Sequence, residues 1–221
     1  MSRWLIVAMV VTLVAAVGAL GVYYGAYEHL RSDVAVHWDW SFQPDATVPR
    51  ADALPYLLLF PAVMAGVILL AVLLPWISPK QFSVEPFRRA WDYIMALVVI
   101  LFGYLFLAQV LSSLEGGPEI GRLFLGGIFL FFALIGNVLG KVQRNFWMGV
   151  RTPWTLASET VWNRTHRLTA WLWFAFGLIG FVAVMFGIPP LWLFIGLIVA
   201  VLIPVLYSLV LYKQLERAGK V

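Results

Sequence analysis

Long uncharged runs dominate the hydrophobic pattern of the chain. Six runs contain no Asp, Glu, Lys, Arg or His, and each is about as long as a helix that crosses a bilayer core of about 30 Å. Since the bilayer core has no water for unpaired backbone groups, we predict an all-α, polytopic membrane protein with six transmembrane helices. The runs are Trp4–Tyr27, Leu54–Ile77, Tyr93–Ser113, Leu123–Gly140, Leu168–Ile188 and Leu191–Tyr212.

The composition agrees with this pattern. The chain has 221 residues, of which 62% are hydrophobic and 12% are charged, whereas soluble domains carry about 25% charged residues. The six runs leave no room for a soluble domain, so we expect residues 1–221 to form a single membrane domain. The chain has no cysteine, which excludes disulfides, thiolate metal ligands and cysteine nucleophiles.

Basic residues are distributed unevenly between the connections of the six runs. Twelve Lys and Arg residues lie in the alternate segments that include the two termini, and three lie in the other segments, at Arg31, Arg50 and Arg122. Cytoplasmic loops of membrane proteins carry an excess of Lys and Arg, so we predict that both termini are cytoplasmic. Anionic headgroups of the lipid bilayer then account for the net charge of +4, and no direct contact with nucleic acid is expected.

The predicted external loop, residues 28–53, has the opposite charge. It carries five acidic residues against two Arg. Apolar and polar positions alternate over residues 34–39, which predicts a short strand or extended segment, followed by a turn at residues 43–45. The alternative is a solvated loop without a partner.

The six runs offer little chemistry. Proton-coupled transporters generally carry an ionisable residue at membrane depth, and its absence from the runs weakens a transporter of peptide or lipid, which stays the alternative function. The chain has no HExxH or GxSxG motif, and the external His and carboxylate residues have no spacing that is diagnostic of a metal. We therefore predict no enzyme, no cofactor and no metal site.

The longest polar interruption in the second half of the chain, residues 141–173, is rich in Arg and Trp. It holds five basic residues and five Trp. Because Thr152 precedes Pro153, we expect extended backbone at Thr152. Thr155 or Ser158 can then cap a helix.

If that helix continues into the fifth run, it is amphipathic. Glu159, near the positive end of the helix, shares one face with Asn163 and His166. Such a helix is an interfacial anchor, a binding surface or, as a third alternative, the support of a Glu159 and His166 acid–base pair. The opposite arc holds Ser158, Val161, Trp162, Thr165 and Leu168.

Two pairs of glycines stand four residues apart in the runs. They are Gly21 with Gly25 and Gly136 with Gly140. Small residues at this spacing let two membrane helices approach closely, so each pair is a candidate helix contact.

One stretch of the polar interruption resembles a known family. Residues 145–156, NFWMGVRTPWTL, followed by Trp162 and by the triplet at residues 165–167, are similar to the SdpI signature N-[FY]-x-x-G-[IV]-R-T-P-W-T-L and W-x-x-T-H-R. The similar region spans about residues 123–212. The predicted partner-binding residues on the cytoplasmic side are Asn145, Arg151, Thr152, Pro153, Trp154, Thr155, Glu159, Trp162, His166 and Arg167.

The external loop resembles the DUF1648 element, over about residues 4–54. The similar positions are residues 35–39, the Pro44-Asp45 pair and Arg50, while Phe42 stands where that element usually has Gly. The external site residues implied by this resemblance are His37, Trp38, Asp39, Pro44 and Asp45.

The SdpI resemblance implies a function for the whole chain. It implies immunity to a membrane-active peptide toxin of the sporulation-delaying type, which would meet the acidic external loop. In part of the family it also implies signalling, in which a cytoplasmic surface sequesters an ArsR-type repressor. The expected partners are therefore the lipid bilayer, a peptide toxin outside and an ArsR-type repressor inside.

Overall fold

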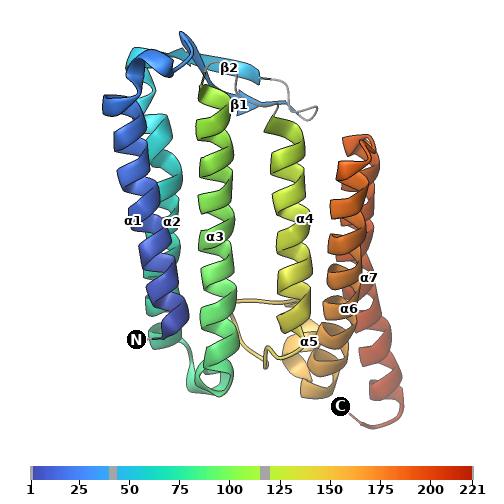
Figure 1. Ribbon diagram of the computed structural model, residues 1–221. Helices are drawn as coiled ribbons and strands as arrows, with labels where there is room; N and C mark the ends of the chain where they lie inside the picture. Colours follow the sequence, from blue (N-terminus) through green and yellow to red (C-terminus); the bar gives the residue numbers. More distant parts are fainter. Residues whose placement is uncertain (1, 40–43, 115–119, 221) are drawn as a thin grey trace. The chain divides into compact units, whose positions relative to one another are not determined.

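Six long helices overlap the six predicted runs, three of which continue one to three residues past the end of the helix (Figure 1). The computed structural model describes residues 2–39, 44–114 and 120–220. All six helices are long and apolar enough to cross a membrane, which confirms an all-α, multi-pass membrane protein. The side of the membrane on which the termini lie stays a prediction. The helices are α1 (Arg3–Gly25), α2 (Leu54–Ile77), α3 (Arg88–Ser113), α4 (Ile120–Leu139), α6 (Glu159–Met185) and α7 (Pro190–Arg217).

Short elements connect these helices. Two strands, β1 (Asp33–Trp38) and β2 (Pro44–Pro49), form an antiparallel hairpin between α1 and α2. A five-residue helix, α5 (Pro153–Ala157), precedes α6. The connections also contain 3-10 helices at Tyr27–His29, Arg50–Asp52, Lys80–Phe82 and Glu85–Phe87.

Two of the helices begin well before the uncharged runs that predicted them. Helix α3 begins at Arg88, where the Arg88 Nε atom donates to Asp92 Oδ1 across one turn at 3.0 Å. Helix α6 begins at Glu159, because the Ser158 side chain caps it by accepting from the Val161 N–H at 3.5 Å. An uncharged run therefore marks only the apolar part of a helix, and a cap or an ion pair extends the helix beyond it.

The chain folds into two compact units. The first unit comprises residues 1–70 and 95–128, and the second comprises residues 71–94 and 129–221. Helices α2, α3 and α4 each contribute one part to each unit. The single membrane domain expected from the sequence stays a prediction.

The first unit packs small side chains of α1 against larger ones of its neighbours. Ala8, Ala15 and Ala19 are buried in one cluster with Leu57 and Met64 of α2. The cluster continues into α3 through Ala96, Val99, Phe106 and Val110. Small residues on α1 let the helices approach closely. Close packing matters here because helices in lipid have no hydrophobic driving force for association.

The β hairpin belongs to the first unit. Strand β1 confirms the predicted extended segment, and Val34 is its fully buried position. The predicted turn is only partly described: Pro44 and Asp45 lie in β2, whereas Gln43 and Phe42 fall outside the described residues. At the base of the hairpin, the Arg31 N–H donates to the carbonyl oxygen of Ser113 at 2.9 Å, which ties it to the end of α3.

The second unit brings α4 and α6 into backbone contact. A Cβ atom on Gly136 would lie 2.4 Å from the amide nitrogen of Phe174, and one on Gly177 would lie 2.3 Å from that of Ala133. No side chain fits in these places, so the predicted Gly136 contact is confirmed. The Gly21 and Gly25 prediction is wrong, because a Cβ atom at either position would meet nothing within 4 Å.

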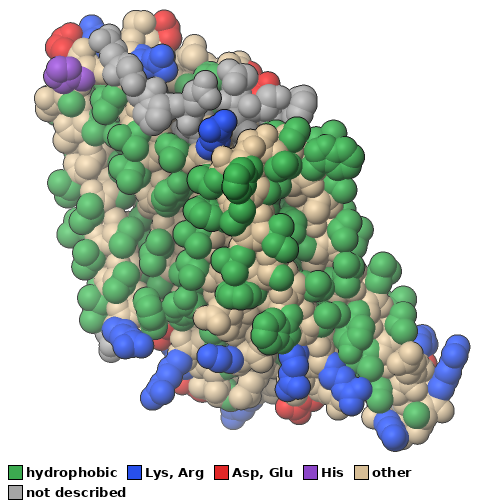
Figure 2. Space-filling view, turned by 45° about the vertical axis from the view of Figure 1, so that its right-hand side comes forward, with side chains coloured by type: hydrophobic (Ala, Val, Ile, Leu, Met, Phe, Trp, Pro, Cys, Tyr) green, Lys and Arg blue, Asp and Glu red, His purple; other side chains and the backbone are tan. Residues whose placement is uncertain are grey.

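The helix surfaces have the composition that lipid requires. Hydrophobic side chains dominate the surface along the helices, while Lys and Arg side chains lie mainly at helix ends (Figure 2). Val14, Ile179 and Leu206 are each more than 60% exposed. Apolar side chains on this scale are stable in hydrocarbon and not in water, which agrees with a multi-pass location in the cell membrane.

Candidate functional site

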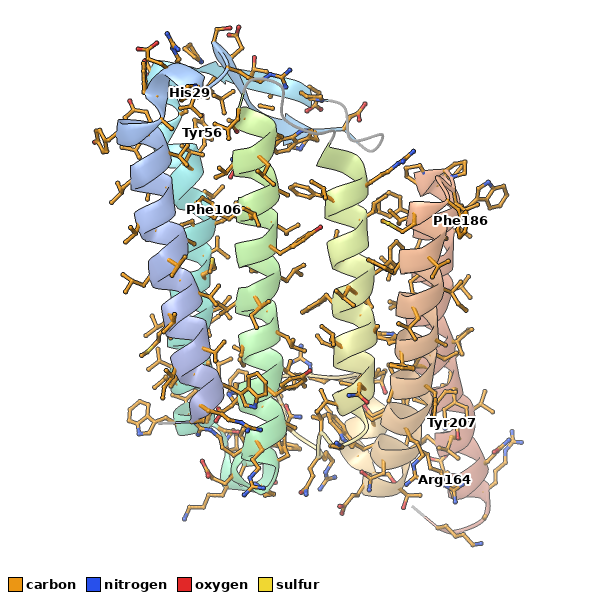
Figure 3. All side chains as sticks on the ribbon, in the orientation of Figure 1. His29, Tyr56, Phe106, Arg164, Phe186 and Tyr207 are labelled. Carbon is orange, nitrogen blue, oxygen red and sulfur yellow. The ribbon has the colours of Figure 1, made fainter. Side chains whose placement is uncertain are left out.

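The residues with the SdpI-like signature, 145–167, which we call the signature segment, connect α4 to α6 within the second unit. A loop leads into α5, and α5 packs against α6 and against α7. Arg164, in the signature segment, and Phe186 lie near opposite ends of α6, and Tyr207 lies on α7 toward the Arg164 end (Figure 3). The segment is therefore built at one end of a helical pair.

Asn145 is the centre of the loop. Its side chain is fully buried, and its Oδ1 atom accepts from the N–H groups of Trp147 at 2.8 Å and Met148 at 2.9 Å. Its Nδ2 atom donates to the carbonyl oxygens of Gln143 at 2.9 Å and Met148 at 3.2 Å. Two donors and two acceptors use the hydrogen-bonding capacity of a primary amide. Asn145 therefore shapes the loop, and no part of its amide is left for a partner.

His166 is held as a neutral acceptor by the backbone of the same loop. The Val150 N–H group donates to His166 Nε2 at 3.0 Å, so Nε2 carries no proton. The ring proton is then on Nδ1, which donates to the carbonyl oxygen of Trp162 at 2.9 Å. Both ring nitrogens are occupied, and the ring is 1% exposed.

This burial corrects the predicted face of α6. Glu159 and Asn163 are exposed, whereas His166 is buried, so the three residues do not share a solvent-facing surface. His166 lies at the edge of the buried arc, one turn from Trp162, and the close stacking of these two rings draws it inside. The rest of the predicted opposite arc is confirmed, with Leu168 partly buried and its other residues buried.

Gly149 permits the contact between loop and helix. Its φ is +108°, a conformation that residues with a side chain rarely adopt. A Cβ atom at this position would lie 2.2 Å from His166 Nε2. Sequence reasoning did not select Gly149 as a site residue, although the signature itself specifies glycine there.

Trp162 fixes the other side of the imidazole. Its ring stacks on that of His166 with centroids 3.9 Å apart and an interplanar angle of 18°. Its Nε1 atom donates to the carbonyl oxygen of Val142 at 2.8 Å, and the side chain is fully buried. Trp162 thus joins α6 to the start of the loop and is a structural residue.

A capping box starts α5. Thr152 has the predicted extended backbone, with φ −102° and ψ 161°, and its side chain accepts from the Thr155 N–H at 3.2 Å. In return, Thr155 Oγ1 accepts from the Thr152 N–H at 2.9 Å. Pro153 occupies the first helical position, where its missing N–H is not needed. Thr152 is therefore the cap in place of the predicted Thr155, while the predicted Ser158 caps α6.

Ser208 of α7 receives this end of the signature segment. The Trp154 Nε1 atom donates to Ser208 Oγ, and Thr152 Oγ1 lies 3.3 Å from the same oxygen. Ser208 in turn donates to the carbonyl oxygen of Val205 at 2.6 Å. Sequence reasoning missed Ser208, whose only signal was a hydroxyl group in an apolar run.

The remaining predicted residues form the exposed surface of the segment. Arg151, Glu159 and Arg167 are exposed, and Arg151 Nη1 donates to the carbonyl oxygen of Phe146. The signature segment thus contains two sets of residues: buried ones that build it, and exposed ones that can contact headgroups or a protein. The residues brought together in the buried set are Asn145, Thr155, Trp162 and His166.

A cavity of about 420 Å³ lies beside the signature segment within the second unit. Residues 148–152 form part of its lining, and side chains from α3, α4, α6 and α7 form the rest. Apart from Arg151, Thr152 and Thr169, the lining side chains are apolar or Trp.

The site residues predicted for the external loop lie in the first unit. His37 Nδ1 and Asp45 Oδ1 are 2.6 Å apart across the hairpin, and both side chains are exposed. Trp38 is opposite Pro44 in the ladder, and Asp39 follows β1 directly. Within residues 2–39, 44–114 and 120–220, no group of three or more His, Asp or Glu residues could hold a metal ion.

Comparisons with known proteins confirm the resemblance on which the segment was selected. Residues 141–208 match the SdpI/YfhL protein family. A relative, "Immunity protein SdpI" of Bacillus subtilis (strain 168), is 25% identical over 144 residues, which cover 65% of each chain. No solved structure matches. The match to the family ends at Ser208, the residue that receives Trp154.

Proposed function

We propose that this membrane protein, which is similar to the SdpI family over residues 141–208, protects its cell against a membrane-active peptide toxin. The observation that carries the proposal is the similarity to a protein named as an immunity protein, which extends over 144 residues. The chain spans about 65% of that relative, so its activity is transferred here as a proposal.

The hairpin supports a role in meeting the toxin. Glu28, Asp33, Asp45 and Asp52 are exposed on or beside it. Glu28 pairs with Arg50 at 3.3 Å, and Asp45 pairs with His37, so part of this charge is compensated. The excess of carboxylates would still attract a cationic or amphipathic peptide and would raise its rate of encounter.

The signature segment supports a role in contacting a soluble partner. Its buried hydrogen bonds hold the loop in one conformation, so little conformational entropy is lost when a partner binds its exposed face. Arg151 and Arg167 would supply charged contacts from that face. An ArsR-type repressor sequestered at this surface is the partner that we propose on the cytoplasmic side.

A survival assay tests the protective role. The chain is expressed in a bacterium that lacks its own immunity protein, and the cells are exposed to a sporulation-delaying type of peptide toxin. We expect survival with the intact chain and killing with the empty vector. Equal killing of both across a panel of peptide toxins, with the chain present in the membrane fraction, contradicts the proposal.

The contribution of the hairpin is tested in the same assay. The double variant Asp33→Asn, Asp52→Asn removes two exposed carboxylates outside the two hairpin ion pairs. We expect weaker protection at high toxin dose and a smaller dependence on salt, because the variant reduces electrostatic attraction. The matched control replaces two exposed acidic residues on other elements, Glu85→Gln and Glu216→Gln, and should protect like the unaltered chain.

The repressor role is tested by fractionation. The chain is coexpressed with an ArsR-type repressor, and the repressor is measured in membranes and cytosol before and after toxin is added. We expect toxin to move the repressor to the membrane and Arg151→Gln with Arg167→Gln to prevent this. A repressor that stays soluble with toxin present removes this role but leaves immunity intact.

A further inference from the structure

We propose that the cavity of the second unit binds the acyl chain of an anionic membrane lipid, with Arg151 beside the lipid headgroup. The volume of about 420 Å³ lies within the range of ligand sites, about 300 to 1,000 Å³. This site goes beyond the immunity role and does not depend on it. It assigns a ligand to a space that the signature loop helps to enclose.

The walls of the cavity suit a hydrocarbon chain. They are formed by Ile94 of α3, Ile135 and Leu139 of α4, Trp173 of α6, and Val201 and Val205 of α7. A polar ligand would lose its hydration against these side chains without gaining hydrogen bonds, at a cost of several kcal/mol (about 2 to 7) for each polar group. An acyl chain has no such desolvation cost, because it passes from one apolar environment, the bilayer, to another.

Pro204 and Trp173 pair two polar groups at the cavity wall, the carbonyl oxygen of Ala200 and the indole N–H of Trp173. Pro204 lies inside α7 and has no N–H, so the carbonyl oxygen of Ala200, four residues earlier, lacks its helical donor. The Trp173 Nε1 atom donates to that oxygen at 3.3 Å and replaces the missing bond. Both Pro204 and Trp173 line the cavity. The pairing satisfies the indole and the carbonyl together and leaves the indole's carbon atoms to contact a ligand.

The signature loop gives the cavity one charged end. Residues 148–152 line it there, and Arg151 is exposed. One N–H of the Arg151 guanidinium donates to the Phe146 carbonyl oxygen, and a guanidinium has five such donors. No carboxylate in the described part of the chain lies within ion-pair distance of Arg151. A cation at the end of an apolar space selects an amphiphile with an anionic headgroup.

Lipid retention by the intact chain tests the cavity. The purified chain in detergent is equilibrated with equal amounts of dioleoyl phosphatidylglycerol and dioleoyl phosphatidylcholine, and retained lipid is counted by native mass spectrometry. Val205→Phe fills the cavity, whereas Leu206→Phe makes the same change at the next position of α7, where the side chain is 61% exposed. We expect Val205→Phe to lower retained lipid about tenfold and Leu206→Phe to retain it. Equal retention by these two variants overturns the proposal.

The headgroup assignment has its own pair of variants. Arg151→Gln should lower the preference for phosphatidylglycerol over phosphatidylcholine about fivefold, since one basic residue at a membrane surface contributes about that factor. Arg164→Gln removes an exposed arginine of the same segment that does not line the cavity and should leave the preference unchanged. An unchanged preference in Arg151→Gln, or an equal loss in both variants, overturns the role of Arg151.

A measurement on the unaltered chain guards against variants that fail to fold. Phosphatidylglycerol with a photoreactive diazirine on its acyl chain is added, and the crosslinked peptides are mapped. We expect labelling of Val205 or Trp173, and unlabelled phosphatidylglycerol should compete for it more effectively than phosphatidylcholine. Labelling confined to outward-facing positions such as Leu206, or displacement by a cationic amphipathic peptide but not by lipid, contradicts the lipid site.

Discussion

The hairpin of the first unit and the signature segment of the second unit are both polar connections between apolar helices, yet they are held together differently. The hairpin depends on a backbone ladder with exposed ion pairs, such as His37 with Asp45. The signature segment depends on buried side chains that bond the backbone, such as Asn145 and Thr155.

This difference explains why one connection has a long recognisable signature. A backbone ladder accepts almost any residue at exposed positions, and exposed ion pairs contribute about 0 to 1 kcal/mol. A buried side chain that bonds the backbone has few replacements, because a partner left unpaired costs about 1 to 3 kcal/mol. The signature therefore records mainly what the loop needs in order to fold, and its exposed residues are the ones to test for binding.

Gly149→Ala should break the signature segment most severely. The new Cβ atom would lie 2.2 Å from His166 Nε2 at a backbone φ of +108°. Strain and the lost hydrogen bond to Val150 together predict a loss of about 4 kcal/mol. The measurement is thermal or denaturant unfolding of the full chain in detergent. Gly21→Ala, where nothing lies within 4 Å, is the matched control, and equal effects would contradict the comparison.

Asn145→Ala should come next. It leaves two partly buried N–H groups and two carbonyl oxygens without their partner, which predicts a loss of about 3 kcal/mol in the same unfolding measurement. Asn145→Asp keeps the two acceptor contacts but turns a carboxylate oxygen toward the carbonyl oxygens of Gln143 and Met148, so it should be at least as unstable as Asn145→Ala. An aspartate variant as stable as the unaltered chain would contradict the importance of the two donor contacts.

Ser208→Ala should have an intermediate effect. It removes the acceptor of the Trp154 indole and so detaches α5 from α7, with a predicted loss of about 1 to 2 kcal/mol. Thr12→Val is the control, because the Thr12 hydroxyl group donates only to the Ala8 carbonyl oxygen of its own helix at 2.9 Å. The difference in unfolding free energy between the two variants measures the contribution of the contact between α5 and α7.

Asp45→Asn in the hairpin should have the smallest effect, below about 1 kcal/mol. Its partner His37 is 69% exposed at the side chain, so water competes for the pair. The unfolding midpoint should therefore hardly move, and toxin protection is measured beside it. A loss of stability as large as that of Asn145→Ala would show that the hairpin, too, depends on specific side chains.

Much of this architecture was predictable from the sequence, because lipid imposes a simple pattern on spanning helices. The six helices, the extended β1 strand, the extended backbone at Thr152 and the cap at Ser158 all reflect local preferences within a few residues of chain, whereas the cap of α5 is Thr152 and not the predicted Thr155. The predicted roles of Gly21 and of the His166 face were wrong, because both depend on which neighbour a helix meets.

The candidate site was less predictable for the same reason. Ser208 lies 54 residues after Trp154, and no local pattern connects them. The signature identified the residues of the segment, but burial divides them into buried residues that stabilise the loop and exposed residues that can contact a partner. That division depends on the folded structure, because Asn145 and Arg151 are both polar residues, yet one is buried and the other is exposed.

Helix α7 has one further property, which concerns its motion. Pro204 removes the backbone hydrogen bond between residues 200 and 204, so α7 can bend there without breaking another backbone hydrogen bond. The indole of Trp173 holds this point only from the outside, by a single bond to Ala200. Bending of α7 at Pro204 is therefore opposed by one hydrogen bond from Trp173. That residue belongs to α6, the helix that begins in the signature segment.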